Sequence, residues 1–389
     1  MRNNILVFLL FVRVAVAGFS QETDAQETDS RKTNLYTFFA NIIVKERRQM
    51  PLIGGRFPLI GLVNIAKGDY ADAHLGLVNG NTGHFTGLQL GFFNTAGGNV
   101  NGMRAGFANI ARGDENGLQA GFLNIVGGDR NGLHVGFVNV VGGHENGLHA
   151  GFVNITGGSV NGIHAGLVNI IGGGVNGIHL GFVNAISESA NGIQAGFVNA
   201  VDGTANGIQL GFVNVAAKGM SGLQTGFFNY ADHVEKGIPV GVISIVRSGG
   251  YQAAEYGFSE WYPVQIAVKL GVEKFYTSII GACDSGGENL ASGVGIGKVM
   301  KTGNAFFFNP EINVLSTLVA DGHMFLSLLP LFGCTVTRHF SIMLGPSVTW
   351  THRYGGAVLK EPVFSIYEYN IDSGNRITAG AKAGARFRL

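Results

Sequence analysis

The sequence predicts an all-β protein in which a β-solenoid of fifteen-residue repeats is followed by a C-terminal antiparallel β-barrel. Two observations predict this fold. The phrase Gly-Phe/Leu-x-Asn recurs every fifteen residues from Gly61 to a degenerate copy at Gly241, with no insertion. After residue 248 the repeat stops, and apolar residues alternate with small or polar ones to the end of the chain. A fixed internal period indicates stacked repeats, and two-residue alternation indicates half-buried strands.

The composition fits such a β-array. The chain has 389 residues, of which 46% are hydrophobic and 13% charged, and it contains 63 glycines. Low charge with a high glycine content is typical of a β-array or a membrane barrel rather than of a cytosolic enzyme. The formal net charge of +1 gives no reason to expect a nucleic-acid partner.

Residues 1–17 have the pattern of a secretory signal peptide. Arg2 supplies a positive charge, residues 5–17 are mostly apolar, and residues 15–17 form a small-x-small cleavage site. Residues 18–50 predict a linker and an N-terminal cap, because a solenoid needs its open edge covered. We therefore expect an exported protein. In such a chain Cys283 and Cys334 could form a disulfide, or equally be small core residues.

Each repeat, as in residues 131–145, predicts one or two short strands and a turn. The β-branched and aromatic residues favour strands, and the flanking Asn-Gly and Gly-Gly pairs favour turns. Helical repeats need about thirty or more residues and tolerate few glycines. Two architectures fit residues 51–248. One is a parallel solenoid with one coil per repeat, and the other is a single large antiparallel outer-membrane barrel with one strand per repeat.

An asparagine column favours the solenoid. In a parallel stack identical residues lie about 4.8 Å apart, so the asparagines would form a ladder of amide hydrogen bonds. The constant spacing also differs from a membrane barrel, which alternates short turns with long loops. Uninterrupted alternation would place Val135, Phe137 and Asn139 on one face, with aliphatic and phenylalanine columns filling the core. The ladder consists of Asn109, Asn124, Asn139, Asn154, Asn169, Asn184, Asn199 and Asn214.

A second polar column follows the Asn-Gly-Leu/Ile phrase. Four consecutive histidines about 4.8 Å apart would be close enough to share a metal ion. Because glutamine occupies the same column elsewhere, we expect a hydrogen-bonding role and assign no metal, cofactor or catalytic residue. No phosphate loop, nucleophile elbow or zinc-protease motif occurs, so an enzyme is not expected. The column consists of Gln119, His134, His149, His164, His179, Gln194 and Gln209.

Residues 249–389 predict an antiparallel barrel. The last strand places Phe387 and several alanines on one face, opposite Lys382 and Arg386. An apolar outside and a polar lumen are typical of outer-membrane barrels, whereas a soluble β-sandwich with core aromatics is the alternative. The expected strands lie near 262–272, 274–283, 291–300, 305–315, 323–333, 338–350, 363–370 and 377–389. Aromatic residues near strand ends suit an interfacial girdle, namely Trp261, Tyr262, Tyr276, Trp350 and Tyr354.

The phrases GLQAGFLN, GLHVGFVN and GIQLGFVN resemble the GLQIGLVN-type repeats of bacterial surface-repeat proteins, which occur notably in Bacteroidetes and spirochaetes. The junction GIPVGVISIVRSGGYQAAEYGFSEWYPVQIAVKLGVEKFYTSIIGA and the later phrases NAFFFNPEINVLS and FSIMLGPSVTW resemble the strand-rich part of that family. The resemblance covers roughly residues 55–389. It implies an exported, outer-membrane-associated protein and brings no catalytic residues.

The function expected from the sequence is structural or binding. We expect a surface-repeat protein at the bacterial outer membrane or cell surface, anchored by its C-terminal barrel. The expected partners are outer-membrane lipid and an unidentified surface ligand or protein. One alternative is an outer-membrane pore or transporter formed by all strands. Another is a metal-binding protein or an enzyme that uses the histidine column.

Overall fold

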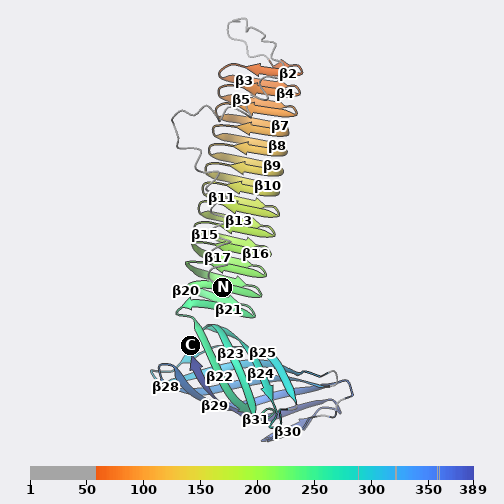
Figure 1. The fold of residues 1–389 in the computed structure, drawn as a ribbon, viewed down its shortest axis with the longest axis vertical. Coiled ribbons are helices and arrows are strands. Elements are labelled where there is room, and N and C mark those ends of the chain that lie inside the picture. Colours follow the sequence, from red (N-terminus) through yellow and green to blue (C-terminus); the bar gives the residue numbers. More distant parts are fainter. Residues whose placement is uncertain (1–57, 288, 320–321, 357, 359) are drawn as a thin grey trace. The chain divides into compact units, whose positions relative to one another are not determined.

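The structure is a computed structural model that describes residues 58–287, 289–319, 322–356, 358 and 360–389 (Figure 1). These residues form a parallel and an antiparallel β-sheet and contain no helix. None of them belongs to a helix with the length and apolar character that a bilayer span requires. The predicted signal peptide (1–17), the linker and cap (18–50) and the first residues of the repeat array (51–57) lie outside the described residues.

The repeats form one sheet that coils into a solenoid (Figure 1). Each coil supplies residues on both sides of its Gly-Phe/Leu pair, and in four central coils these join into one long strand. The strands are β1 (Leu59–Ile60), β2 (Val63–Ala66), β3 (Tyr70–Leu75), β4 (Val78–Asn81), β5 (Phe85–Leu90), β6 (Phe93–Ala96), β7 (Val100–Ala111), β8 (Glu115–Val126), β9 (Arg130–Val141), β10 (Glu145–Thr156), β11 (Val160–Ala165), β12 (Val168–Ile171), β13 (Val175–Leu180), β14 (Val183–Ile186), β15 (Ala190–Ala195), β16 (Val198–Val201), β17 (Thr204–Leu210), β18 (Val213–Ala216), β19 (Gly219–Thr225), β20 (Phe228–Val240) and β21 (Ile243–Ser248).

Neighbouring coils pair in parallel with an offset of fifteen residues. Between β9 and β10, for example, His134 lies beside His149 and Asn139 beside Asn154. The predicted parallel β-solenoid is confirmed, with about 13 turns. The alternative of a single large antiparallel barrel is wrong, because the repeat strands pair in parallel with their counterparts in adjacent coils.

The chain turns a corner at each Gly-Phe pair, and this corner decides which side chains face the interior. A Cβ on Gly151 would lie 2.2 Å from the carbonyl oxygen of Gly136 in the preceding coil, so a side chain has no room there. The next residue, Phe152, points outward and is 46% exposed, whereas Asn154 is fully buried. The predicted faces are therefore wrong, because the corner interrupts the two-residue alternation.

The phenylalanine column lies on the outer surface and does not fill the core. Its rings stack nearly parallel, with centroids 5.0 Å apart for Phe107 and Phe122 and 4.8 Å apart for Phe137 and Phe152. Part of the interior is aliphatic, as predicted, and is filled by Ala111, Val126, Val141, Ile171, Ile186 and Val201. Other interior columns are polar, and the asparagine column is one of them. The solenoid therefore has polar columns beside aliphatic ones in its interior, and further apolar columns outside.

Residues after Ser248 form an antiparallel sheet that closes into a barrel of eight strands. The strands of this sheet are β22 (Tyr251–Ser259), β23 (Val264–Val272), β24 (Phe275–Cys283), β25 (Leu290–Gly297), β26 (Met300–Lys301), β27 (Phe306–Thr317), β28 (Gly322–Thr337), β29 (Phe340–Tyr354), β30 (Tyr367–Asn370) and β31 (Asn375–Arg388). The ring runs through β22, β23, β24, β25, β27, β28, β29 and β31, and β31 pairs back with β22. Cys283 and Cys334 are both free.

The predicted barrel is confirmed, but its strand assignment contains two errors. Strand β22, which closes the ring against β31, lies before the first predicted strand. Its outward positions carry Gln252, Ala254, Tyr256 and Phe258, so large apolar residues occur only in its second half and the alternation is short. The predicted strand at 363–370 is not in the ring, because only Tyr367–Asn370 forms a short strand there and its residues are exposed.

The outward side chains of the barrel are largely apolar, and many of its inward side chains are polar or charged. In β31 the inward Thr378, Lys382 and Arg386 are buried, as the sequence predicts. Exposed apolar residues of the other ring strands include Tyr256, Phe258, Ile266, Val268, Ile279, Leu290, Val294, Ile296, Phe306, Ile312, Val314, Leu328, Phe332, Val336, Ile342, Leu344 and Val348. The two faces of the barrel thus differ sharply in polarity.

Three of the five aromatic residues predicted to form a girdle lie inside the barrel instead. Trp261, Tyr262 and Tyr276 are buried. Trp261 packs against Phe325 with ring centroids 5.0 Å apart, and the Tyr276 hydroxyl donates to Glu311 at 2.6 Å. The prediction is wrong for these three residues, because proximity to a strand end does not determine which face a side chain takes.

Replacing Gly177 by alanine should destabilise the solenoid by roughly 3 kcal/mol or more. Gly177 has a φ of +152°, and a Cβ there would lie 1.9 Å from the carbonyl oxygen of Gly162. The control is Gly174→Ala, whose Cβ would meet nothing closer than 3.3 Å. Thermal unfolding of the full chain, followed by circular dichroism, should show a lower Tm for Gly177→Ala only. Equal melting temperatures for the two variants would contradict the described stacking.

Candidate functional site

The asparagine column forms a buried chain of amide hydrogen bonds. Each Nδ2 donates to Oδ1 of the asparagine in the next coil and to a carbonyl oxygen before the corner, as Asn139 does to Asn154 at 2.9 Å and to Ala150 at 3.0 Å. Both amide hydrogens are thereby satisfied, which buried polar groups require. Bonds of 2.8–2.9 Å join Asn109, Asn124, Asn139, Asn154, Asn169, Asn184 and Asn199 in sequence, and Asn214 to Asn229.

The glutamine and histidine column also faces the solenoid interior. All of its candidate residues, Gln119, His134, His149, His164, His179, Gln194 and Gln209, are at most 3% exposed. Successive histidine rings have centroids 4.6, 4.7 and 5.0 Å apart, as stacked coils require. His134 bonds to Gln119 on one side and to His149 on the other. These side chains therefore form one buried polar column.

A neighbouring interior position adds buried charges. It holds an apolar residue in most coils, such as Val160, but Glu115, Arg130 and Glu145 in three consecutive coils. Arg104, from the glutamine and histidine column, forms an ion pair with Glu115. Arg130 Nη1 lies 4.0 Å from Glu145 Oε1. Two guanidinium groups therefore offset two carboxylates inside the solenoid, which is the condition for burying such charges.

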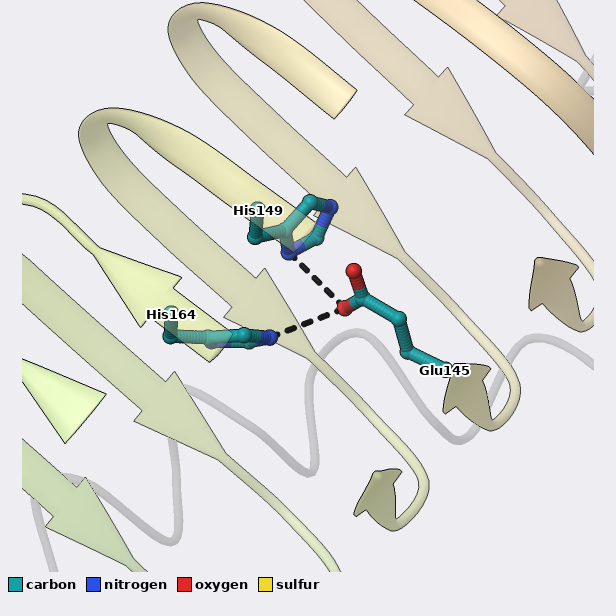
Figure 2. A group of neighbouring side chains, drawn as sticks. All are labelled: Glu145, His149 and His164. Carbon is teal, nitrogen blue, oxygen red and sulfur yellow. Dashed lines mark hydrogen bonds and ion pairs between the residues drawn. The ribbon is translucent and has the colours of Figure 1, made fainter. Parts of the chain in front are cut away.

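Glu145, His149 and His164 form the buried histidine cluster (Figure 2). Strand β10 supplies Glu145 and His149 on its inner face, and β11 of the next coil supplies His164. Glu145 Oε2 lies 2.8 Å from His149 Nδ1 and 2.9 Å from His164 Nε2. The same oxygen accepts a hydrogen bond of 2.9 Å from the Thr156 hydroxyl. A carboxylate and two imidazoles at this spacing could share a proton or hold a divalent transition metal.

Burial and the contacts within the cluster shift the pKa values of Glu145 and His149. Burial lowers the pKa of His149 to about 4, despite the opposing effect of the Glu145 carboxylate. Burial alone would raise the pKa of Glu145, but His149 and His164 outweigh it through charge and hydrogen bonding and hold that pKa below its usual value. Within the cluster the histidine contacts therefore favour the carboxylate form of Glu145, whereas burial disfavours a charged His149.

The sequence analysis places both histidines of the cluster but misses Glu145. The histidine column alone favours hydrogen bonding, because glutamine shares it. Glu145 adds the carboxylate that changes the chemistry. Its signal is a charged residue in a column that is otherwise filled by Val100, Val160, Val175, Ala190 and Ala205. Column-by-column comparison of the repeats would have found it.

The barrel interior holds a second cluster, the lumen network, which consists of Glu255, Lys269, Glu311, Lys382 and Arg386. All five residues are buried. The Glu255 carboxylate lies 2.7 Å from Lys269 Nζ and 3.0 Å from Lys382 Nζ. Arg386 Nη2 lies 2.8 Å from Glu255 and 3.1 Å from Glu311, and Lys269 also contacts Glu311. Each charge of this network thus has at least one opposite partner.

No family model, curated protein or solved structure matches the chain.

The Asn154→Ala variant should lose about 3 kcal/mol of unfolding free energy, because it leaves a donor on Asn139 and an acceptor on Asn169 buried without a partner. Asn146→Ala is the matched control in the same coil. Asn146 bonds to Asn131 at 3.0 Å on the exposed face, where water replaces a lost bond, so its loss should stay below about 1 kcal/mol. Denaturant unfolding of the full chain measures both. Similar losses would show that the buried ladder is not a major source of stability.

His74 should make the stability of the solenoid depend on pH. Burial lowers its pKa to about 4 from the ordinary 6.5. As the pH falls below 6.5 the unfolded chain takes up a proton that the folded chain does not, so stability declines until the folded pKa is reached. His74→Gln, which copies Gln89 in the next coil, lacks this titration. Between pH 7.5 and pH 5 the wild type should lose roughly 2 kcal/mol relative to the variant, and a constant difference would contradict the assignment.

Proposed function

We propose that the protein is an exported, outer-membrane-associated protein whose C-terminal barrel is a membrane anchor and whose solenoid has a structural or binding role. The observation that carries this proposal is the polarity of the barrel. Its outward side chains are largely apolar, and its interior combines many charged and polar side chains with an aromatic cluster around Trp261 and Phe325. A barrel in water buries its apolar side chains, whereas a barrel in a bilayer turns them to lipid and keeps its interior polar.

The exposed apolar residues form rows across neighbouring strands. Ile312 pairs with Leu328, and Leu328 pairs with Val348. Each of the three is at least 44% exposed. The strands that carry them, β27, β28 and β29, have 12, 16 and 15 residues. A tilted strand needs roughly 9–11 residues to cross the hydrocarbon core of a bilayer, so these strands are long enough for the proposed role.

The interior of the barrel supports an anchor rather than a pore. The lumen network joins charges from β22, β23, β27 and β31. Glu260 accepts further hydrogen bonds of 2.7 Å from the hydroxyls of Ser347 and Thr349. Eight strands enclose a space that side chains of this size fill. A pore formed by all strands would also need the repeats as barrel strands, and they are coils of a solenoid instead.

The outer surface of the solenoid supports a structural or binding role. Its exposed apolar side chains recur coil after coil, and those of the phenylalanine column are Phe92, Phe107, Phe122, Phe137, Phe152, Phe182, Phe197, Phe212 and Phe227. Exposed charged residues such as Asp114 and Asp129 occur at the turns. Extended apolar surface of this kind marks contact with another protein or with lipid. The resemblance to bacterial surface-repeat proteins and the predicted signal peptide are consistent with display outside the cytoplasm.

An arginine placed on the outward face of the barrel should reduce its unfolding free energy in a bilayer. The loss should be larger at the middle of a strand than at its end. Val348 lies near the middle of β29 and is exposed, so Val348→Arg should cost about 2–4 kcal/mol in lipid. Val336, which is exposed near the end of β28, is the control, and Val336→Arg should cost no more than about 1 kcal/mol. The measurement is urea unfolding of the full chain folded into phosphatidylcholine vesicles.

Two outcomes would overturn the membrane anchor. The first is that the full chain folds and remains monodisperse in buffer without detergent or lipid. The second is that both arginine variants unfold from vesicles as the wild type does, because an outward charge would then never meet hydrocarbon.

A further inference from the structure

The hydrogen bonds that lead into the buried histidine cluster have a direction, and Gln119 sets it. The side chain of Gln119 donates from Nε2 to the Glu115 carboxylate. Its Oε1 therefore faces His134 Nε2, which must carry a hydrogen to bond to it. A neutral His134 then has its lone pair at Nδ1, so the neighbouring His149 Nε2 is the donor in their contact.

This direction leaves a lone pair of His149 facing the Glu145 carboxylate. A neutral His149 with its hydrogen on Nε2 has a bare Nδ1, and that atom lies 2.8 Å from Glu145 Oε2. Two acceptors at this distance repel each other unless a cation lies between them. The cation is either an additional proton or a metal ion. A proton there would join only Glu145 and His149, whereas a metal ion could also be bound by a third ligand atom.

His164 supplies a third ligand atom from the adjacent coil. Its Nε2 lies 2.9 Å from the same carboxylate oxygen, and its Nδ1 has no hydrogen-bond partner. The three atoms, Glu145 Oε2, His149 Nδ1 and His164 Nε2, all lie within 4.8 Å of one another. Figure 2 shows both imidazoles directed at this oxygen. A carboxylate with two imidazoles is a donor set typical of zinc and related metals.

We propose that Glu145, His149 and His164 bind one divalent transition-metal ion, with Zn²⁺ as the best match, independently of the proposed membrane function. Zinc bonds of about 2.0–2.1 Å in a tetrahedral site place ligand atoms roughly 3.3 Å apart. Each imidazole nitrogen would therefore move away from the carboxylate oxygen by about 0.5 Å. The Thr156 hydroxyl, 2.9 Å from that oxygen, is a neighbouring oxygen for the fourth position.

The surrounding residues support ligation at this coil and not at the others. His134 accepts the hydrogen of His149 Nε2 and so keeps His149 Nδ1 free for the metal, as outer-shell partners of zinc-bound histidines do. Arg130 lies 4.0 Å from the other carboxylate oxygen, Oε1, and leaves Oε2 available. Glu115 occupies the equivalent position two coils earlier, but its carboxylate bonds to Arg104 and Gln119, which cannot replace the imidazoles.

Burial gives the metal a structural role. All three ligands are 0–1% exposed, so the ion must enter while the coils assemble and cannot exchange freely afterwards. It joins β10 to β11 through side chains, in addition to the backbone pairing of these strands. A chelator should therefore lower the Tm when it is present during folding, and have little effect when it is added to the folded protein.

The test uses the full chain, unfolded with a chelator and refolded in detergent with Zn²⁺ or with Co²⁺. After removal of unbound ions, the wild type should retain about one ion per chain, measured by elemental mass spectrometry. The Co²⁺ form should show the visible absorption of a tetrahedral site. Glu145→Gln and His164→Gln should retain no ion. The matched control is His179→Gln, which changes the same column one coil beyond the cluster and should keep the ion.

Two results would overturn the proposal. One is a wild type that refolds in Zn²⁺ or Co²⁺ and retains no ion, which would identify the cation as a proton. The other is a Glu145→Gln variant that retains as much ion as the wild type, which would place the metal on exposed histidines such as His84. If Glu145→Gln does not refold, His164→Gln and the Co²⁺ spectrum of the wild type decide between these outcomes.

Discussion

Parallel stacking at a fifteen-residue offset is the constraint on which the solenoid depends. Because each residue lies beside its own counterpart, an inward side chain is stable only if it can bond to or pack against a similar one. Asparagine meets this condition because its amide both donates and accepts. A carboxylate does not, because adjacent like charges repel. This explains why Glu115, Arg130 and Glu145 alternate in sign along one interior column.

Both parts of the chain have polar groups inside, but they satisfy them in different ways. In the solenoid the partner of an asparagine is another asparagine one coil away. In the barrel the partner is a residue of opposite charge reached across the lumen, as when Lys269 meets Glu255 and Glu311. The first arrangement requires identical neighbours and the second requires complementary ones. The need for identical neighbours explains the repeated phrase of the solenoid. The need for complementary neighbours explains why the sequence after residue 248 is not repetitive.

The fifteen-residue period and the asparagine column were enough to predict a parallel stack, because only that arrangement brings identical amides together. The positions of individual side chains were less predictable. Phe137 faces outward because the chain turns a corner at Gly136. The fifteen-residue repeat contains no insertion at this corner, so the hydrophobic pattern of the sequence does not reveal it. Glu145 is marked in the sequence by its charge in an otherwise apolar column, but its contacts with His149 and His164 span two coils and follow only from the stacking register. In the barrel, the alternation of β31 predicted Lys382 and Arg386 inside, whereas Trp261 and Tyr276 could not be assigned a face from their position near a strand end.

The asparagine ladder has a polarity, since Asn109, Asn139 and Asn184 all donate from Nδ2 toward the C-terminal side. Its last described donor, Asn229, bonds to the hydroxyl of Ser244 at 3.2 Å, where the repeat would otherwise place another asparagine. A hydroxyl accepts this bond but has no amide with which to extend the series. The ladder of amide hydrogen bonds therefore ends at Ser244. A coil without buried charges can therefore be gained or lost without breaking the ladder, whereas the C-terminal end of the ladder is fixed by a single side chain.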